Sequence, residues 1–486
     1  MKPISRRDFV AAAVGTSVAY LLDGKLTFAQ SASATDQLRV QQVASKLPSF
    51  EGVFVFDESV RRAMATDFGN YVHKMPLGVL FPKNIQDVQK AVRFANAQQV
   101  KIGMRGTGGA AYGQSQVASG IVINSSSLAR VAWVAPDIVD AEPGALWKDV
   151  VELTLARGVA PPVIPDSLFL SVGGTLNAGG LGDTSYRLGA QVDHVVELDV
   201  VTGSGDFVTC SLSRETELFQ MTLAGMGQCA IIVRARVRLL PAPQDIVVRS
   251  FAYADRGAFL TDLAMLANSE PHGAISGELD PSDDGKAWTP VINVMSFEKT
   301  EPTWASKVKG KVSEVAKTET FSAYLDRFSE HILAAQASGA WFVPHVFMHF
   351  FLPADQTLPM VNYLLDTPGA ALGAAWMAVF PMINANFKQP LRRMPDGALS
   401  YHLRIYRSAK QENSPEHLQM LALNQKECLP RILASGGKVY LPFSPLLDAS
   451  QRLQQFGHST WERLEKAKAK YDPKSILTPG AGLFPS

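Results

Sequence analysis

A glycine-rich stretch that follows a short apolar segment is the sharpest chemical feature of the sequence. It reads Arg105-Gly106-Thr107-Gly108-Gly109-Ala110-Ala111-Tyr112-Gly113-Gln114. Glycines at this density let the backbone adopt positive φ angles, and successive N–H groups in such a turn form a concavity suited to a pyrophosphate. The stretch is neither a P-loop, because no Gly-Lys-Ser/Thr follows, nor a clean Rossmann fingerprint, because no capped helix begins there. Taken alone, such a turn is more often a structural loop.

Two further glycine-rich turns change that interpretation. Residues 171–182 read Ser-Val-Gly-Gly-Thr-Leu-Asn-Ala-Gly-Gly-Leu-Gly, and residues 224–228 read Ala-Gly-Met-Gly-Gln and lead into an apolar strand. Between them, residues 195–201 are expected to form a strand that ends in another glycine turn. Turns of this kind beside successive strands indicate an extended ligand lying across one domain, and a dinucleotide has those dimensions.

The elements that would position these turns alternate between strands and helices from residue 76 to residue 241. Strands are expected over residues 78–81, 101–104, 121–124 and 230–237, a helix capped by Asn84, and a second helix over residues 145–157. Such alternation predicts an α/β or α+β domain.

The pattern differs from about residue 244 to residue 433. Helices are expected there over residues 258–267 and 321–335, and aromatic-rich strands over residues 341–352 and 400–407. We therefore expect a second domain. Residues 437–484 are too few to fold alone and carry a cofactor-type motif, so they are expected to return to the first domain.

Composition limits the classes of partner. The chain has 486 residues, 47% of them hydrophobic, which is enough for two cores, and its 46 basic and 45 acidic residues give a net charge of +1. That balance favours neither nucleic acid nor an anionic membrane as partner. No membrane span is expected in the mature protein. The three cysteines are scattered, so neither a disulfide framework nor a cysteine-based metal site is expected.

The first residues have the pattern of a targeting segment. Ser5-Arg6-Arg7-Asp8-Phe9-Val10 is a twin-arginine motif, an apolar run continues to Leu22, and small residues follow at positions 29–34. This predicts a twin-arginine signal peptide over residues 1–34 and a periplasmic or secreted protein. The alternative is a frayed amphipathic helix.

The order of the glycine motifs resembles the FAD-binding domain of cytokinin dehydrogenases, which belong to the vanillyl-alcohol-oxidase (PCMH-type) flavoprotein family. The matching motifs are RGxGxxxxGQ, PDxLxLxVGGTLNAGG, VxELDVVTGxGxxVTCS and GxGQxxIIxRA, followed by KVYLP at 438–442 and YDPKSILTPG at 471–480. Weaker similarity to the substrate domain lies at residues 350–353, 380–381, 394–397 and 406–409. The resemblance covers about residues 50–484.

The resemblance implies an α+β fold of two domains. The FAD-binding domain would be split between residues 35–243 and the returning segment 435–486, and residues 244–434 would form an α+β substrate-binding cap. Carried over by position, the residues expected to contact FAD are Met104, Arg105, Gly106, Thr107, Gly108, Gly109, Ala110, Gly113, Gln114, Asp166, Ser171, Gly174, Thr175, Asn177, Leu181, Ile231, Tyr440, Thr478 and Ala481.

One position departs from the family pattern. Cytokinin dehydrogenases carry a histidine in RGxGHS that bonds covalently to the flavin, whereas Gly109 and Ala110 stand at the histidine and serine positions here. Glycine has no nucleophile, and no cysteine lies near residues 166–174 to supply the second link that some relatives use. The resemblance therefore implies FAD held non-covalently.

Asp166, in Pro165-Asp166-Ser167, matches the family's active-site aspartate, which accepts a proton from the substrate amine while hydride leaves for the flavin N5. Burial beside an apolar flavin face is expected to raise its pKa and make it a better base near neutral pH. Without the resemblance, such a tripeptide is more commonly a turn. The substrate-facing glutamate that the family often has before a glycine is not carried over, because Ser276 precedes Gly277 here.

An aromatic cluster at 341–351, which includes His345 and His349, has two interpretations. Alternate aromatic residues in a strand are more often core than pocket lining, and no carboxylate or cysteine at useful spacing supports a metal, so none is expected.

Two functions from different classes follow. The first is an FAD-dependent dehydrogenase or oxidase that takes hydride from a carbon bearing an amine, as on an N6-isoprenoid adenine (cytokinin), with oxygen or a quinone as electron acceptor. A related flavin enzyme of another secondary amine, an alcohol or a sugar-like substrate is the alternative. The second class is an exported flavin-binding protein without turnover.

Overall fold

The computed structural model describes residues 40–269, 273–282, 287–297 and 302–485. The expected signal peptide over residues 1–34 lies outside the described residues. Within the described part of the chain, no helix is long and apolar enough to cross a membrane.

A four-stranded sheet forms the N-terminal layer. Strands β2 (Gly78–Phe81), β4 (Ile121–Asn124) and β3 (Ile102–Arg105) run parallel, and β1 (Val53–Val55) pairs antiparallel with β2 at the edge. Helix α4 (Ile85–Gln98) begins where the Asn84 side chain accepts a hydrogen bond from the Asp87 N–H at 3.0 Å, as predicted. The apolar face of α4 packs on this sheet.

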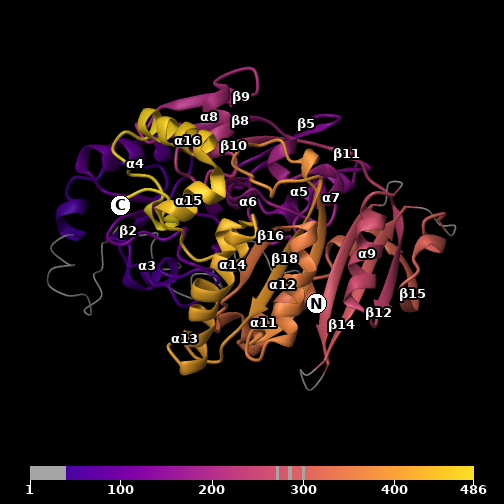
Figure 1. Ribbon diagram of the computed structural model, residues 1–486. Coiled ribbons are helices and arrows are strands. Elements are labelled where there is room, and N and C mark those ends of the chain that lie inside the picture. The colour runs from indigo at the N-terminus through magenta and orange to yellow at the C-terminus, as the bar shows by residue number, and fades with distance from the viewer. Residues whose placement is uncertain (1–39, 270–272, 283–286, 298–301, 486) are drawn as a thin grey trace.

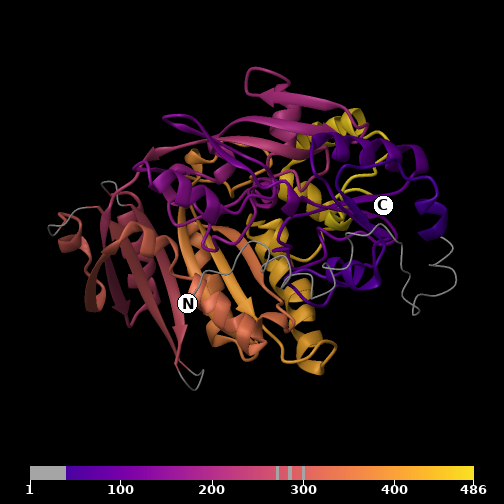
Figure 2. The same ribbon diagram turned by 180° about the vertical axis from the view of Figure 1, so that it is seen from behind.

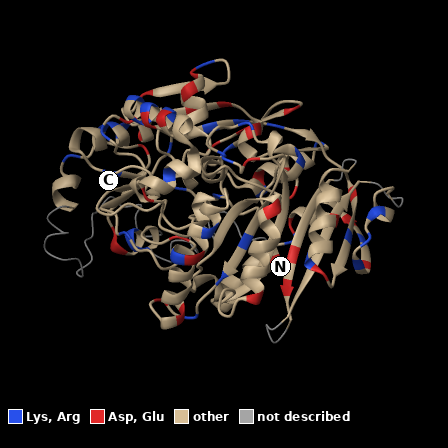
Figure 3. Ribbon diagram, viewed as in Figure 1, with Lys and Arg blue, Asp and Glu red and all other residues tan. Residues whose placement is uncertain are grey.

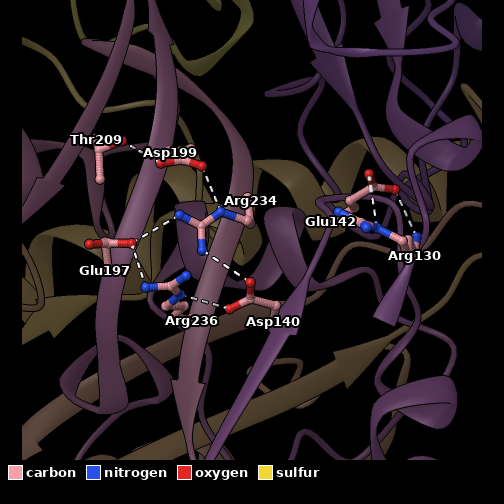
Figure 4. Close-up of polar contacts among 8 residues, drawn as sticks. All are labelled: Arg130, Asp140, Glu142, Glu197, Asp199, Thr209, Arg234 and Arg236. Atoms are coloured by element: carbon pink, nitrogen blue, oxygen red, sulfur yellow. Dashed lines mark hydrogen bonds and ion pairs between the residues drawn. The ribbon is translucent and has the colours of Figure 1, made fainter. Parts of the chain in front are cut away.

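A five-stranded antiparallel sheet lies next to it, in the order β5 (Val131–Ala135), β6 (Ile138–Ala141), β10 (Ala230–Arg238), β8 (Val195–Thr202) and β9 (Phe207–Ser211). Figure 4 shows how charges join three of these strands: Arg234 of β10 donates to Asp199 at 2.6 Å, Glu197 at 2.9 Å and Asp140 at 3.1 Å. Helices α5 (Trp147–Leu155), α6 (Val172–Ala178) and α8 (Thr216–Thr222) accompany this sheet and contribute to its core.

The second half of the chain forms an eight-stranded sheet, coloured pink to orange in Figures 1 and 2. Its order is β15 (Lys311–Thr320), β12 (Asp245–Tyr253), β14 (Trp288–Ser296), β13 (Ala274–Pro281), β17 (Ala374–Ile383), β18 (Leu399–Arg407), β16 (Met348–Pro353) and β19 (Lys438–Val439). All pairs are antiparallel. The predicted boundary between residues 434 and 435 assigns β19 to the returning segment, whereas β19 pairs with β16 and therefore belongs to the sheet of the second half of the chain.

Strand alternation gives the two faces of this sheet different roles. On β18, Tyr401, Leu403 and Ile405 pack in a core with helices α9 (Arg256–Ala267), α12 (Ala354–Asp366) and α14 (Leu429–Ala434), which lie over one face in Figure 1. The intervening His402 and Arg404 therefore point to the opposite face, toward the FAD-type motifs of the first half.

The C-terminal segment returns to the N-terminal sheet. After helices α15 (Ala449–Phe456) and α16 (His458–Tyr471), which lie beside the N-terminal half in Figures 1 and 2, the Ile102 N–H donates to the Ile476 carbonyl at 2.8 Å and the Thr478 N–H donates to the Ile102 carbonyl at 2.8 Å. The remaining elements are α3 (Glu58–Met64), α7 (Ser185–Leu188), α10 (Phe321–Leu325), α11 (Ser329–Ser338), α13 (Pro415–Ala422), β7 (Val159–Ala160) and β11 (Leu240–Pro241).

Two expected elements differ from the structure. The helix expected over residues 321–335 is two helices, α10 and α11, because the chain turns between them to direct Arg327 toward the buried Asp183. The strand expected over residues 341–352 begins only at Met348, because Pro344 lacks an N–H donor and Trp341 lies in a short 3₁₀ turn.

Along the ribbon in Figure 3, positions of basic residues (blue) and acidic residues (red) are interspersed. That distribution agrees with the net charge of +1.

Candidate active site

A pocket lies where distant chain segments meet: the turn after β3, the start of α6, the turn before β10, the segment after β19 and the C-terminal segment at Thr478. It encloses about 940 Å³ of empty space, including the open solvent at its mouth. Of the residues predicted to contact the cofactor, those that line it are Met104, Arg105, Gly106, Thr107, Gly108, Gly109, Ala110, Gln114, Ser171, Gly174, Thr175, Asn177, Tyr440 and Thr478.

Glycine is required at two positions of the turn after β3. A Cβ on Gly106 would lie 2.0 Å from the Ser171 hydroxyl oxygen, and Gly108 has a φ of +76°. Only the absence of a side chain lets residues 105–110 approach the start of α6 this closely. The wall of the pocket is consequently backbone, which offers N–H groups and little steric bulk to a ligand.

Gly113 and Gln114 support the turn. The Gly113 N–H donates to the Asp67 carboxylate at 2.7 Å, and the Gln114 amide donates to the Leu441 carbonyl at 2.8 Å. Burial raises the pKa of Asp67 to about 6, against the lowering effect of the Gly113 hydrogen bond. Gly113 does not line the pocket itself, and Asp67 was not anticipated from the sequence.

Three other predicted contacts lie away from the pocket lining. Leu181 and Ala481 are buried in the core beneath the site, and Ile231 packs against the N-terminal sheet while its neighbour Ile232 faces the pocket. Adjacent residues of a strand point to opposite faces, so the pocket side of β10 is carried by residue 232.

The turn before β10 and the C-terminal segment meet at the pocket. The Thr478 hydroxyl donates to the Gly227 carbonyl at 3.2 Å, and the Gln228 amide donates to the Thr478 carbonyl at 3.0 Å. Both Met226 and Thr478 have positive φ angles, of 52° and 44°. These contacts position Gly227 and Thr478 on the same wall.

Asp166, whose side chain is 25% exposed, forms an ion pair with the buried Arg404 of β18. Arg404 is 5% exposed, and its guanidinium lies 4.2 Å from the Phe380 ring centroid and 3.5 Å from the Tyr406 hydroxyl. Asp166 thus lies between the glycine-rich segments and the polar face of the large sheet. It is not itself part of the pocket lining.

The expectation that the Asp166 pKa is raised is wrong. Burial does raise the pKa, but the charges of Arg404 and Arg327 outweigh burial and hold it below its ordinary value. The neighbouring carboxyl, Asp183, has the opposite shift, because burial and the Asp166 charge raise its pKa. Asp183 accepts hydrogen bonds from Tyr324 at 2.6 Å and from Arg327.

The aromatic cluster divides between core and site. Phe350 is buried under the helices, Phe342 is 67% exposed, and the Phe347 centroid lies 6.1 Å from that of the pocket residue Phe443. His345 shares a hydrogen bond with the Ser408 hydroxyl at 2.9 Å, whereas the His349 Nε2 is buried without a partner. Among the described residues, no group of three potential ligands could hold a metal ion.

Sequence reasoning missed Arg404, Arg327 and Asp183. A signal for Arg404 was present, because Ser400, His402, Arg404 and Tyr406 alternate with apolar residues, which is the pattern of a strand with one polar face. Nothing local indicated which residue that face would meet.

Comparison with known proteins agrees with this geometry. A family model described as "FAD binding domain" matches residues 76–211, and one described as "Cytokinin dehydrogenase 1, FAD and cytokinin binding" matches residues 307–484. Cytokinin dehydrogenase 7 of Oryza sativa subsp. japonica is 30% identical over 97% of this chain and 97% of its own length. The chain belongs to the cytokinin dehydrogenase family.

Two further relatives cover most of this chain. Cytokinin dehydrogenase 6 of Oryza sativa subsp. japonica is 30% identical over 97% of both chains. An uncharacterized oxidoreductase, ORF5 in the fasciation locus of Rhodococcoides fascians, is 28% identical over 88% of this chain and 98% of its own length. The protein is accordingly an FAD-dependent oxidoreductase of PCMH type.

The pocket fits FAD, the cofactor of the family. Backbone approach at Gly106 and Gly108 suits phosphate groups, and the aromatic rings of Tyr440 and Phe443 suit a flat ring system. The Asn177 side-chain oxygen is buried without a hydrogen-bond partner. Its burial destabilises the folded state unless a donor group of a bound ligand forms a hydrogen bond to it. Asn177 also lines the pocket.

Proposed function

We propose that this protein is an exported FAD-dependent dehydrogenase or oxidase that takes hydride from a carbon bearing an amine, on a substrate of the N6-isoprenoid adenine (cytokinin) type. The observation that carries the proposal is the Asp166 carboxylate, held by Arg404 between the FAD-type pocket and the polar face of the cap sheet. Similarity to relatives named cytokinin dehydrogenases over nearly the whole chain supports the substrate class.

Asp166 acts as the base. As hydride leaves the substrate carbon, the Asp166 carboxylate accepts the proton of the adjacent N–H, so the carbon–nitrogen bond becomes an imine. Water then divides the imine into adenine and an aldehyde. The positive charge of Arg404 keeps the carboxylate ionised. Its guanidinium also orients the carboxylate, because contacts with Phe380 and Tyr406 fix the position of the guanidinium. Bound FAD supplies the two-electron acceptor, and oxygen or a quinone reoxidises it.

The cofactor is held non-covalently in this proposal. Gly109 lines the pocket without a side chain, and its place in the turn corresponds to the family's linking histidine. The pocket residues named above would hold FAD, and the returning C-terminal segment, through Tyr440 and Thr478, would complete the FAD-binding domain. The Arg6-Arg7 motif supports export to the periplasm or beyond by the twin-arginine route.

The test is anaerobic mixing of the FAD-loaded protein with N6-isopentenyladenine while the oxidised-flavin absorbance is recorded. We expect bleaching in the wild type and, in Asp166→Asn, a reduction rate that is slower by roughly a hundredfold or more, since a positioned base contributes about that much. Asp396→Asn, an exposed cap aspartate, is the matched control and should retain the wild-type rate.

Two outcomes would refute the proposal. If no amine or alcohol bleaches the flavin, the protein binds FAD without turnover. If Asp166→Asn, with normal FAD content, is reduced as fast as the wild type, Asp166 is not the base. Bleaching by an alcohol but not by the adenine would instead assign the alternative substrate class.

A further inference from the structure

Arg392 is a buried arginine without an acceptor. It lies between β17 and β18, is 5% exposed, and its Nε has no hydrogen-bond partner. No side chain or carbonyl among the described residues accepts a hydrogen bond from its guanidinium. The other buried arginines all have acceptors or a carboxylate partner: Arg61 (Pro76 carbonyl), Arg105 (Thr66 carbonyl), Arg249 (Glu314), Arg404 (Asp166) and Arg407 (Ala370 and Leu372 carbonyls).

The guanidinium of Arg392 lies behind the wall of the FAD pocket. Its Cζ is 5.0 Å from the Tyr440 ring centroid and 4.5 Å from that of Phe351. The side chain also reaches the end of α6, because a Cβ on Gly179 would lie 3.1 Å from the Arg392 Cδ. Tyr440 and Asn177, two residues before Gly179, both line the pocket.

The electrostatic surroundings do not neutralise this charge. Burial lowers the pKa of Arg392 to about 10, which still leaves the guanidinium protonated at neutral pH. The acidic groups that influence it are Tyr440 and Asp193, and the Asp193 carboxylate already accepts hydrogen bonds from the N–H groups of Ala190, Lys388 and Gln389. His402, also nearby, is held neutral by burial and by the surrounding arginines.

An unpaired buried cation has a large unfavourable desolvation free energy, and its contacts with the faces of the two aromatic rings offset only part of that free energy. The arrangement is therefore suited to an anion that is present only at one stage of the reaction. With FAD bound, such an anion would arise in the neighbouring pocket, because hydride would bring two electrons and one proton to a neutral oxidised flavin and leave the ring with a net charge of about −1.

We propose that Arg392 is the residue that stabilises the negative charge of the reduced flavin. By doing so it favours hydride acceptance and raises the reduction potential of bound FAD. The proposal depends on FAD binding but not on the identity of the substrate. A carboxylate of the substrate is the other anion that could meet this cation.

The experiment compares wild-type, Arg392→Gln and Arg393→Gln holoproteins. The potential of bound FAD is measured by anaerobic equilibration with a reference dye, and sulfite, which adds to the oxidised ring to give an anionic adduct, is titrated by absorbance. We expect Arg392→Gln to shift the reduction equilibrium at least tenfold toward oxidised flavin, about 30 mV for two electrons, and to weaken sulfite binding by a similar factor. The adjacent, partly exposed Arg393 is the control and should leave both values unchanged.

Two further measurements keep the proposal testable if Arg392→Gln fails to fold. Arg392→Lys preserves the charge and should keep both values within about threefold of the wild type, since both side chains are cations. In the wild type, the potential between pH 5 and 6 should change with the uptake of one proton per two electrons, because Arg392 keeps the reduced ring anionic where free reduced flavin takes up a second proton. Uptake of two protons would overturn the proposal.

The outcomes separate the two anions and the two proposals. If FAD-replete Arg392→Gln has an unchanged potential and an unchanged sulfite affinity, the role at the flavin is overturned. If the same variant also binds benzoate, a probe for a substrate carboxylate, more weakly than the wild type, the cation belongs to the substrate site. A preparation that binds no FAD contradicts the proposed function. Normal FAD content with unaltered redox values contradicts only the role of Arg392.

Discussion

Arg404 sets the charge state of Asp166. Burial alone would favour the neutral acid, and the guanidinium reverses this by favouring the carboxylate. A base with a low pKa is a weaker proton acceptor but is ionised over a wider pH range. Arg404 therefore makes Asp166 a weaker base and, at the same time, keeps it ionised at lower pH.

Replacement of Arg404 tests whether its charge lowers the pKa of Asp166. In Arg404→Met, burial dominates and the pKa of Asp166 rises, so the fraction of carboxylate falls as the pH is lowered. We expect kcat/KM for flavin reduction to fall roughly tenfold or more at pH 5, one pKa unit corresponding to tenfold, with a smaller loss as the pH rises to 9. The measurement is the pH profile of anaerobic flavin reduction.

Arg404→Lys is the matched control, because it keeps the positive charge and should retain the acidic limb of the wild type. A loss in Arg404→Met that is equal at every pH would mean that Arg404 only packs against Phe380 and does not set the charge of the base.

At the scale of elements, helix α16 fastens the C-terminal segment to the site. The buried Lys468 ammonium donates to Asp472 at 2.6 Å and to the Gln228 carbonyl at 2.9 Å, and Asp472 accepts from the N–H groups of Ile476 and Leu477 at 3.0 and 2.9 Å. This cluster joins the turn before β10 to the segment that carries Thr478. The wall of the pocket depends on it.

Lys468→Met should therefore destabilise the protein. It leaves the Asp472 carboxylate buried without its cation, a change that typically costs about 3–5 kcal/mol. We expect a lower midpoint in chemical denaturation, followed by tryptophan fluorescence, together with weaker retention of FAD.

Lys466→Met on the same helix provides the comparison. Lys466 pairs with Glu462 at 2.7 Å, but their side chains are 74% and 64% exposed, and solvent screens such surface pairs so that they contribute little to stability. Equal effects of the two substitutions would contradict the structural role given to the buried cluster.

At the scale of the molecule, the pocket is assembled from segments that are far apart in the chain. Residues 104–115 span the end of β3 and the turn after it, residues 170–178 comprise α6 and the two residues before it, and residues 440–443 and 478 come from the last tenth of the chain. A cofactor bound there contacts all of them at once. It consequently stabilises the folded state of the whole protein by binding that state selectively.

Removal of FAD tests this coupling and the absence of a covalent bond. Acid precipitation should leave the flavin in the supernatant, and the protein freed of FAD by milder extraction should unfold at a lower temperature. Added FAD should restore the transition in a concentration-dependent manner, by about 2.7 kcal/mol at a hundredfold excess over Kd. Flavin that precipitates with the protein would contradict non-covalent binding.

Local patterns in the sequence already specified much of this protein. The capped helix after Asn84, the short apolar strands and the glycine turns depend on neighbours in the chain, so their periodicity and backbone requirements are visible in the sequence. The motifs, their order and the aspartate at position 166 led to the flavoenzyme family. The prediction of one helix over residues 321–335 was wrong, because the chain turns at Arg327, which contacts Asp183 far away in the sequence.

Only the tertiary structure decided the electrostatics of the site. Arg404 lies 238 positions from Asp166, and this contact reverses the pKa shift that burial alone would produce. Arg392 could be recognised as unpaired only once its surroundings were known, and Ile231 lies away from the pocket because strand pairing directs Ile232 toward it. Charge–charge and desolvation energies depend on distances in space, which spacing along the chain does not determine.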